Sequence, residues 1–292
     1  MKTNAIVRII LFTLAILILV GILMVGLLGN LFMIRTDSPD GLIPLASDEM
    51  TTRGGVKASD VQNIDIEWVA GSITIEPAAN IDHISVQETV NDKYQMEMVL
   101  DGKTLKIRYS EDTIKIMGIN YTGSKDLVIT VPDDWFCNSL DIEAASADVT
   151  IHDLTFNKVD FEGASGECDF INCTIERCDI ETVSGNICIV GSVNSFSCDA
   201  VSADCRLELR NCPNSITTDS VSGDLVLVLP ADCGFTCTKD TVSGSFHTDF
   251  VCSGHNDTYI SGDGACQIKV SGVSGDVDIQ SCNDTTGQNC DH

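Results

Sequence analysis

The amino-acid sequence predicts an all-β protein, a single-stranded β-solenoid (β-helix) with coils of about 19 residues, preceded by one N-terminal transmembrane helix. Three observations lead to this prediction. One frame of residues recurs in IDIEWVAGSITIE (64–76), LDIEAASADVTIH (140–152) and CDIETVSGNICIV (178–190). Apolar and polar residues alternate inside each copy, as in strands with one buried face. A long apolar run lies close to the N-terminus.

The apolar run covers residues 9–34 and contains no charged side chain. A helix of about 20 apolar residues crosses a bilayer, and no small-residue cleavage site follows the run, so we expect an uncleaved anchor. Lys2 and Arg8 precede it, which predicts a cytoplasmic segment 1–8 and an extracytoplasmic remainder. Residues 35–60 contain prolines and paired glycines, which are typical of a linker.

The turn of the repeat is a serine or alanine followed by glycine or alanine, and from Ser146 to Ser243 it recurs every 18 to 21 residues. This period is too short for the common helical repeats and fits one coil of a solenoid. Stacked coils align equivalent positions into columns. We expect interior apolar columns one and four residues before the turn serine, and three and five residues after it.

The expected domain is a β-solenoid over residues 61–280. The 76 residues between Ala70 and Ser146 equal four periods, so irregular coils are expected there, with a hairpin at Asp101-Gly102. The expected divisions are irregular coils and hairpin at 77–139, regular coils at 140–250, a cap region at 251–280 and a flexible tail at 281–292.

The 14 cysteines leave three alternatives. Cys168, Cys198 and Cys205 fall in expected interior columns, which favours buried thiols that act as small apolar side chains. Disulfides are permitted outside the cytoplasm, although no two cysteines share a column of neighbouring coils in the expected register. A metal cluster is the third alternative, but the C-x-x-C pairs that are typical of zinc sites do not occur.

The chain carries 43 acidic and 17 basic residues, a formal net charge of −26. Such a surface repels nucleic acid and suits cations or a basic partner. Three residues before the turn serine, one column is acidic. Its members are Glu143, Glu162, Glu181, Asp199, Asp219 and Asp240, with Glu67 in the early copy.

Stacked carboxylates can bind divalent cations such as Ca²⁺ weakly, and these six residues are the candidate metal ligands. The alternative is a solvated face that keeps the protein soluble and prevents edge pairing. No other cofactor is expected. The sequence contains no nucleophile elbow and no phosphate-binding loop, and its five histidines do not share a column. We therefore expect no enzymatic activity and no catalytic residue.

The frame D-I-E-x-V-S-G-x-I-x-I, the segment LVITVP (127–132) and the single N-terminal span resemble the bacterial putative-adhesin family, whose domains have no known function. The resemblance covers roughly residues 60–280. It implies a membrane-anchored β-solenoid at the cell surface with a role in adhesion or envelope stress, and it implies no catalytic residues. The density of cysteines departs from the family.

These inferences predict a single-pass protein of the cell membrane whose solenoid domain is extracytoplasmic. We expect a non-catalytic, adhesin-like binding module with an envelope protein or a glycan as its ligand. The alternative is a structural protein that assembles end to end, or an accessory protein of envelope stress. The sequence specifies neither the ligand nor the oligomeric state.

Overall fold

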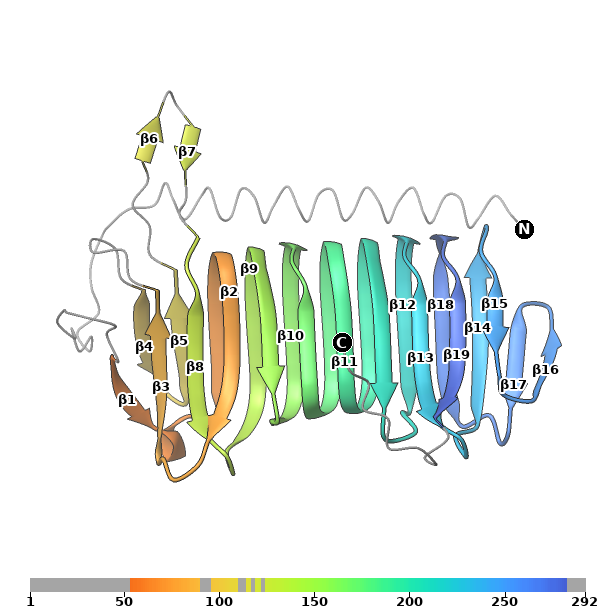
Figure 1. Cartoon of the computed structure of the whole chain (residues 1–292), viewed down its shortest axis with the longest axis horizontal. Coiled ribbons are helices and arrows are strands. Elements are labelled where there is room, and N and C mark those ends of the chain that lie inside the picture. Colours follow the sequence, from red (N-terminus) through yellow and green to blue (C-terminus); the bar gives the residue numbers. More distant parts are fainter. Residues whose placement is uncertain (1–52, 90–95, 110–113, 117–118, 122–123, 283–292) are drawn as a thin grey trace.

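The computed structural model of the chain describes residues 53–89, 96–109, 114–116, 119–121 and 124–282. The expected cytoplasmic segment 1–8 and anchor 9–34 lie outside these residues, as do most of the linker and of the tail. Across the described ranges, no helix is long and apolar enough to span a bilayer. These residues form an elongated stack of strands (Figure 1).

The elements up to the central stack are β1 (Arg53–Lys57), η1 (Ala58–Asp60), β2 (Asn63–Ala78), β3 (His83–Glu88), β4 (Glu97–Asp101), β5 (Thr104–Arg108), β6 (Ile114–Ile116), β7 (Ile119–Tyr121) and β8 (Leu127–Pro132). The central stack continues with β9 (Phe136–His152), β10 (Thr155–Ser165) and β11 (Cys168–Leu209). The C-terminal part contains β12 (Ser215–Ser222), β13 (Leu225–Pro230), β14 (Phe235–Thr241), β15 (Phe246–Thr248), β16 (Cys252–His255), β17 (Thr258–Ser261), β18 (Cys266–Ser274) and β19 (Val277–Cys282).

The strands of the central stack run parallel and in register, one coil above the next. In β10, Phe161 is paired with Ile142 of β9 on one side and with Ile180 of β11 on the other. At the corner, the hydroxyl of Ser165 donates to that of Ser146, 19 residues earlier, at 3.2 Å. The expected solenoid-like, all-β architecture is therefore observed in the described residues.

Three of the four expected apolar columns lie inside the stack. Ile142, Phe161 and Ile180 are at most 2% exposed, and the columns three and five residues after the serine are buried along the central coils. The prediction of an interior column one residue before the serine is wrong, because its members are half-buried and Val242 is 65% exposed. The chain turns at this corner, so the interior position is two residues before the serine, where Ala144 is 1% exposed.

The glycine after the turn serine allows successive corners to approach closely. Gly185 has a φ of +140°, in the region that only glycine adopts without strain. A Cβ atom at Gly185 would lie 2.0 Å from the carbonyl oxygen of Gly166 in the coil below. The same contact recurs at Gly166, whose Cβ would lie 2.2 Å from the carbonyl oxygen of Ala147.

At the N-terminal end, the order of the layers differs from the order of the sequence. Ala70 pairs directly with Ser146, so no coil lies between β2 and β9. The segment 77–139 instead supplies β5 and β8, which form the next layer on the opposite edge of β2. The expected irregular coil and hairpin of 77–139 therefore occur, but they lie beyond β2 and not between the two copies, because the matching frames of β2 and β9 pair with each other.

Antiparallel strands cover that outer layer. β4 pairs with β5, β3 pairs with β8, and β1 pairs with β3. The expected hairpin exists, but Asp101 pairs with Thr104, so the two turn residues are Gly102 and Lys103, one position later than expected. The short strands β6 and β7 form a separate antiparallel pair.

The C-terminal end contains a second inversion of layer order. β18 and β19, named here the inserted coil, lie between β12–β13 on one side and β14–β15 on the other. Only the hairpin β16–β17, which pairs with β14, caps this end of the described stack (Figure 1). The expected cap region 251–280 therefore divides into a terminal hairpin and a regular interior coil.

We predict that Gly185→Ala lowers the free energy of unfolding by about 1–3 kcal/mol, because the new Cβ meets a carbonyl in a conformation that L residues rarely adopt. Denaturant unfolding of the full chain measures the loss. Gly102→Ala is the matched control, since Gly102 also has a positive φ (+61°) but has nothing within 4 Å of its ideal Cβ. Equal losses for the two variants would contradict the close-contact explanation.

Candidate functional site

An unbroken column of carboxylates crosses six successive layers, and we name it the acidic ladder. Its members are Glu67, Glu143, Glu162, Glu181, Asp199 and Asp219. The strand register pairs Glu143 with both Glu67 and Glu162, Glu162 with Glu181, and Asp199 with Asp219. Equivalent side chains in neighbouring parallel strands lie about 4.8 Å apart. Five of the six sequence candidates therefore lie together as expected.

Asp240 is the exception among the candidates. The inserted coil places Ser271 between Asp219 and Asp240, so Asp240 is separated from the ladder by one layer. The sequence order of the repeats made these two aspartates appear to be neighbours. The true order depends on which coil fills the layer between them.

A second acidic column lies two residues earlier and runs beside the ladder. Asp65, Asp141, Asp160 and Asp179 are paired in consecutive layers. Together the two columns form the walls of a groove of about 440 Å³. It is lined by Asp65, Asp141, Ile142, Glu143, Lys158, Asp160, Phe161, Glu162, Asp179 and Glu181, and we name it the acidic groove.

Basic residues neutralise the groove unevenly. Arg108 closes its N-terminal end with ion pairs to Asp65 (2.8 Å) and Glu67 (3.0 Å). Within the groove, Lys158 forms an ion pair with Asp160 two residues along its own strand. Arg177 forms the equivalent pair with Asp179 at 2.6 Å. These basic side chains therefore compensate the second column and the N-terminal end of the ladder more than the ladder from Glu143 to Glu181.

The ladder carboxylates repel one another, and their pKa values reflect it. Partial burial, followed by repulsion from the neighbouring carboxylate, raises the pKa of Glu143, Glu162 and Glu181. The same two causes raise the pKa of Asp199 and of Asp219. The ladder therefore holds charge that destabilises the folded chain at neutral pH and that a bound cation would offset.

A third acidic column, two residues after the turn serine, has a structural role. Each of its aspartates named here accepts a hydrogen bond from the backbone N–H of the equivalent residue in the next layer. Asp148 accepts from Glu167 at 2.9 Å, and Asp224 accepts from Asp276 at 2.7 Å. These carboxylates satisfy backbone donors that the corner leaves unpaired.

The described part of the chain brings no three His, Cys, Asp or Glu side chains into an arrangement that could hold a metal ion. The ladder is linear, and its carboxylates stand side by side on successive layers. A calcium site instead needs six to eight oxygen ligands around one point. Divalent binding at the candidate residues remains a hypothesis of diffuse attraction along the column.

The cysteines of the described ranges divide into free thiols, most of them buried, and a disulfide. Eight lie in the core as free thiols, namely Cys137, Cys168, Cys173, Cys178, Cys198, Cys205, Cys237 and Cys266. Burial raises the pKa of the Cys237 and Cys266 thiols to about 12, so both stay protonated. Cys198 and Cys205, expected inside, are 1% and 4% exposed.

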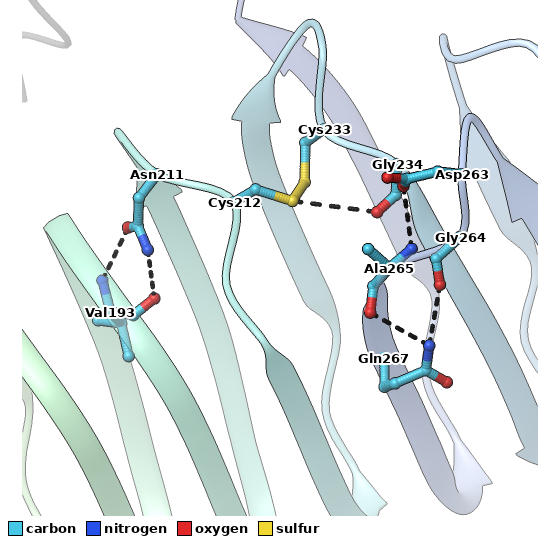
Figure 2. The surroundings of a disulfide bond; sticks show 9 residues. All are labelled: Val193, Asn211, Cys212, Cys233, Gly234, Asp263, Gly264, Ala265 and Gln267. Atoms are coloured by element: carbon cyan, nitrogen blue, oxygen red, sulfur yellow. Dashed lines mark hydrogen bonds between the residues drawn. A yellow bond between two sulfur atoms is a disulfide. The ribbon is translucent and has the colours of Figure 1, made fainter.

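One disulfide joins Cys212 to Cys233, with Cα atoms 5.3 Å apart (Figure 2). The expectation that no two cysteines share a strand column of neighbouring coils did not cover this pair. Both residues lie in the connections before β12 and before β14, outside the strand columns on which that expectation was based. Their separation of 21 residues is close to the repeat length, and this was the available signal.

The raised pKa values of the ladder predict how stability depends on pH. The folded state binds protons more tightly than the unfolded state at these carboxyls, so its stability falls as the pH rises through their folded pKa values. We expect the thermal midpoint to increase when the pH is lowered from 7 to 5. Asp276 does not oppose this change, since hydrogen bonds from the backbone N–H and the hydroxyl of Ser245 lower its pKa and keep it ionised.

A double variant tests whether the ladder causes this dependence. Glu162→Gln with Glu181→Gln is expected to raise the midpoint at pH 7 and to flatten the change between pH 7 and 5. Glu76→Gln, at an exposed carboxylate outside the ladder, is the matched control. If the double variant kept the wild-type pH dependence, ladder repulsion would not be its source.

We predict that Asp224→Ala costs about 1–2 kcal/mol of stability, because the N–H of Asp276 loses its acceptor. Asp224→Asn retains the side-chain oxygen and should cost clearly less. Denaturant unfolding of both variants measures the difference. Equal losses would mean that the carboxylate acts through its charge and not as a cap.

The comparisons with solved structures show low sequence identity. A "putative adhesin" from Bacteroides fragilis NCTC 9343 is 14% identical over 75% of this chain and 94% of its own, with a TM-score of 0.44. A "putative adhesin" from Parabacteroides distasonis ATCC 8503 is 14% identical over 77% and 95%, with a TM-score of 0.41. A "Putative lipid binding protein" from the same organism is 16% identical over 76% and 95%, with a TM-score of 0.35.

No curated protein matches the chain. The model of one protein family does match, and it does so twice, over residues 61–195 and 143–280. The two matches together span the described stack from β2 to β19, including both inversions of layer order. The chain therefore belongs to the Toastrack DUF4097 family.

Proposed function

We propose that this protein is a non-catalytic binding module of the cell envelope. Its N-terminal run anchors it in the cell membrane as a single span, and its solenoid domain is extracytoplasmic. Through the acidic groove it binds a basic segment of an envelope protein. Membership of the family supports a domain without known catalysis, and the groove gives the class of ligand.

The acidic groove carries this proposal. Seven of its ten lining residues are carboxylates, whereas Lys158 is its one basic lining residue. The ladder members Glu143, Glu162 and Glu181 have raised pKa values because burial and mutual repulsion disfavour their charge. A lysine or arginine side chain placed in the groove would relieve that repulsion. A rigid parallel stack presents these groups at a regular spacing, so little conformational entropy is lost when a partner binds.

The disulfide supports the proposed extracytoplasmic location of the domain. Disulfides persist in oxidising environments and are rare in the reducing cytosol. The Cys212–Cys233 bond lies where a soluble reductant reaches it, since Cys212 is exposed. A domain that keeps this bond is consistent with an extracytoplasmic position after a single membrane span.

The arrangement of the carboxylates argues against hydrolysis. A glycosidase needs two carboxyls with different environments, one that stays protonated and one that stays ionised. Here the same pair of acidic positions repeats in Asp141/Glu143, Asp160/Glu162 and Asp179/Glu181. Repeated, equivalent groups suit an extended polar contact better than a single reacting centre.

A basic peptide of alternating lysine and glycine, titrated calorimetrically into the full chain, tests the groove. We expect Glu143→Gln, Glu162→Gln and Glu181→Gln together to weaken binding at least tenfold, or about 1.4 kcal/mol, and to reduce its salt dependence. The control is a variant of equal charge, with Glu76→Gln, Glu97→Gln and Asp134→Asn outside the groove. If both triple variants weakened binding equally, the peptide would sense only the net charge and the site would be refuted.

Titrations of the same variants with calcium and with a neutral glycan distinguish these two other ligands from a basic peptide. Calcium that competes with the peptide, and whose binding is lost in the ladder variant, would indicate the weak divalent site that the sequence suggested. A neutral envelope glycan would bind both triple variants alike and independently of salt. Either result would replace the basic partner as the ligand.

A structural role is the second candidate, and one observation favours it. Val251 is 95% exposed beside the terminal strand β16, which pairs with β17 on one edge. Exposed apolar residues at the end of a stack favour contact with a second copy. A size that increases with protein concentration, and that Val251→Asp abolishes, would support assembly of the chain.

A further inference from the structure

The inserted coil depends on a crossing at the C-terminal end of the stack. β12–β13 and β14–β15 follow one another in the sequence, yet the inserted coil lies between them. Among the described strands, none of the first pair forms a ladder with the second. The chain therefore passes over one layer after Pro230, and that layer is filled only by residues 266–282.

Two backbone carbonyls accept hydrogen bonds from the first residues of the inserted coil. The N–H of Cys266 donates to the oxygen of Gly234, and the N–H of Gln267 donates to the oxygen of Asn214, each at 3.0 Å. Gly234 directly follows Cys233, and Asn214 is two residues after Cys212. The disulfide, drawn in Figure 2 beside Gly234, therefore joins the two segments that carry these acceptors.

The same corner is tied to the layer below. The side chain of Asn211 accepts from the N–H of Val193 at 3.1 Å and donates to its carbonyl at 3.0 Å. Gly234 also packs tightly against the turn before β18, because a Cβ there would lie 2.1 Å from Asp263 Oδ1. A continuous series of contacts thus runs from Val193 through the disulfide to the inserted coil (Figure 2).

The bond is accessible from one side. Cys212 is exposed, whereas Cys233 is 4% exposed. A thiolate of a soluble dithiol attacks Cys212 Sγ, the disulfide breaks, and Cys233 leaves as a thiolate that takes up a proton. The second thiolate of the reductant then attacks the mixed disulfide, closes its own disulfide and releases Cys212 as a thiol. Two electrons pass from the dithiol to the protein.

We propose that the Cys212–Cys233 disulfide is a redox latch that holds the inserted coil in the stack. When it is reduced, the two acceptor segments are no longer held together, and β18–β19 separates from its neighbours more often. The stack from β2 to the end of β11 keeps its own pairings. The acidic ladder, which ends at Asp219, then has an open edge beside it in place of Ser271.

Buried thiols report this opening. Cys237 on β14 and Cys266 on β18 are 0% and 1% exposed, and they become accessible only when these layers separate. Cys168, Cys178 and Cys198 lie in the central coils and are equally buried. The chain therefore contains both its probes and its internal reference.

The experiment is pulsed alkylation of the full chain in detergent, read by mass spectrometry at each cysteine. Cys212→Ser with Cys233→Ser is compared with the oxidised wild type and with the wild type treated with a dithiol. We expect alkylation of Cys237 and Cys266 to accelerate roughly a hundredfold in the double variant and in the dithiol-treated wild type. This is the effect expected when the loop closed by the Cys212–Cys233 bond is released. The rates at Cys168, Cys178 and Cys198 should stay unchanged.

Cys282→Ser is the control, because it removes an exposed thiol and leaves the disulfide intact. Unchanged rates at Cys237 and Cys266 would overturn the latch. An equal acceleration at all five buried thiols would also overturn it, because reduction would then unfold the whole stack. Hydrogen exchange over 266–282, compared with 139–190, gives an independent measurement of the same opening.

Discussion

Parallel stacking of coils in register is the constraint on which the rest of this structure depends. Backbone hydrogen bonds between layers place each residue directly above its equivalent, so every position becomes a column. A column of isoleucine and phenylalanine buries apolar surface with each added layer. A column of glutamate adds one more repulsion with each layer. The same geometry therefore creates both the stable core and the mutually repelling acidic face.

The three acidic columns differ in how their negative charge is compensated. The aspartates two residues after the turn serine accept a hydrogen bond from the backbone N–H of the equivalent residue in the next layer. The second column has Lys158 and Arg177 beside it, and Arg108 closes the N-terminal end. The ladder from Glu143 to Asp219 has the least compensation, and partial burial followed by repulsion from neighbouring carboxylates raises its pKa values. A bound cationic ligand would therefore offset the most carboxylate repulsion along this ladder.

Both ends of the stack depart from sequential order, and the reason is the same. A terminal layer exposes unpaired backbone groups, and a later segment covers that edge. At the N-terminal end, β5 and β8 add a layer beyond β2 and antiparallel strands cover it. At the C-terminal end, the inserted coil fills a layer and the β16–β17 hairpin covers β14. The one described disulfide lies at this second crossing, where the chain passes over a layer that another segment fills.

The sequence alone predicted what repeats locally. The period, the alternation of buried and exposed residues and the small residues at the corners are properties of each coil, so the repeat was enough to assign Phe161 to the core and Glu162 to the outer face. The position of the inner corner was not predictable in this way, because Val183 is as apolar as Ile180 and only the path of the turn leaves it half-buried. Layer order was also beyond the sequence, since equivalent coils compete for the same edge and non-local pairing decides which of them occupies it. For this reason Ala70 meets Ser146, Ser271 separates Asp219 from Asp240, and Cys212 reaches Cys233, and each contact required the tertiary structure.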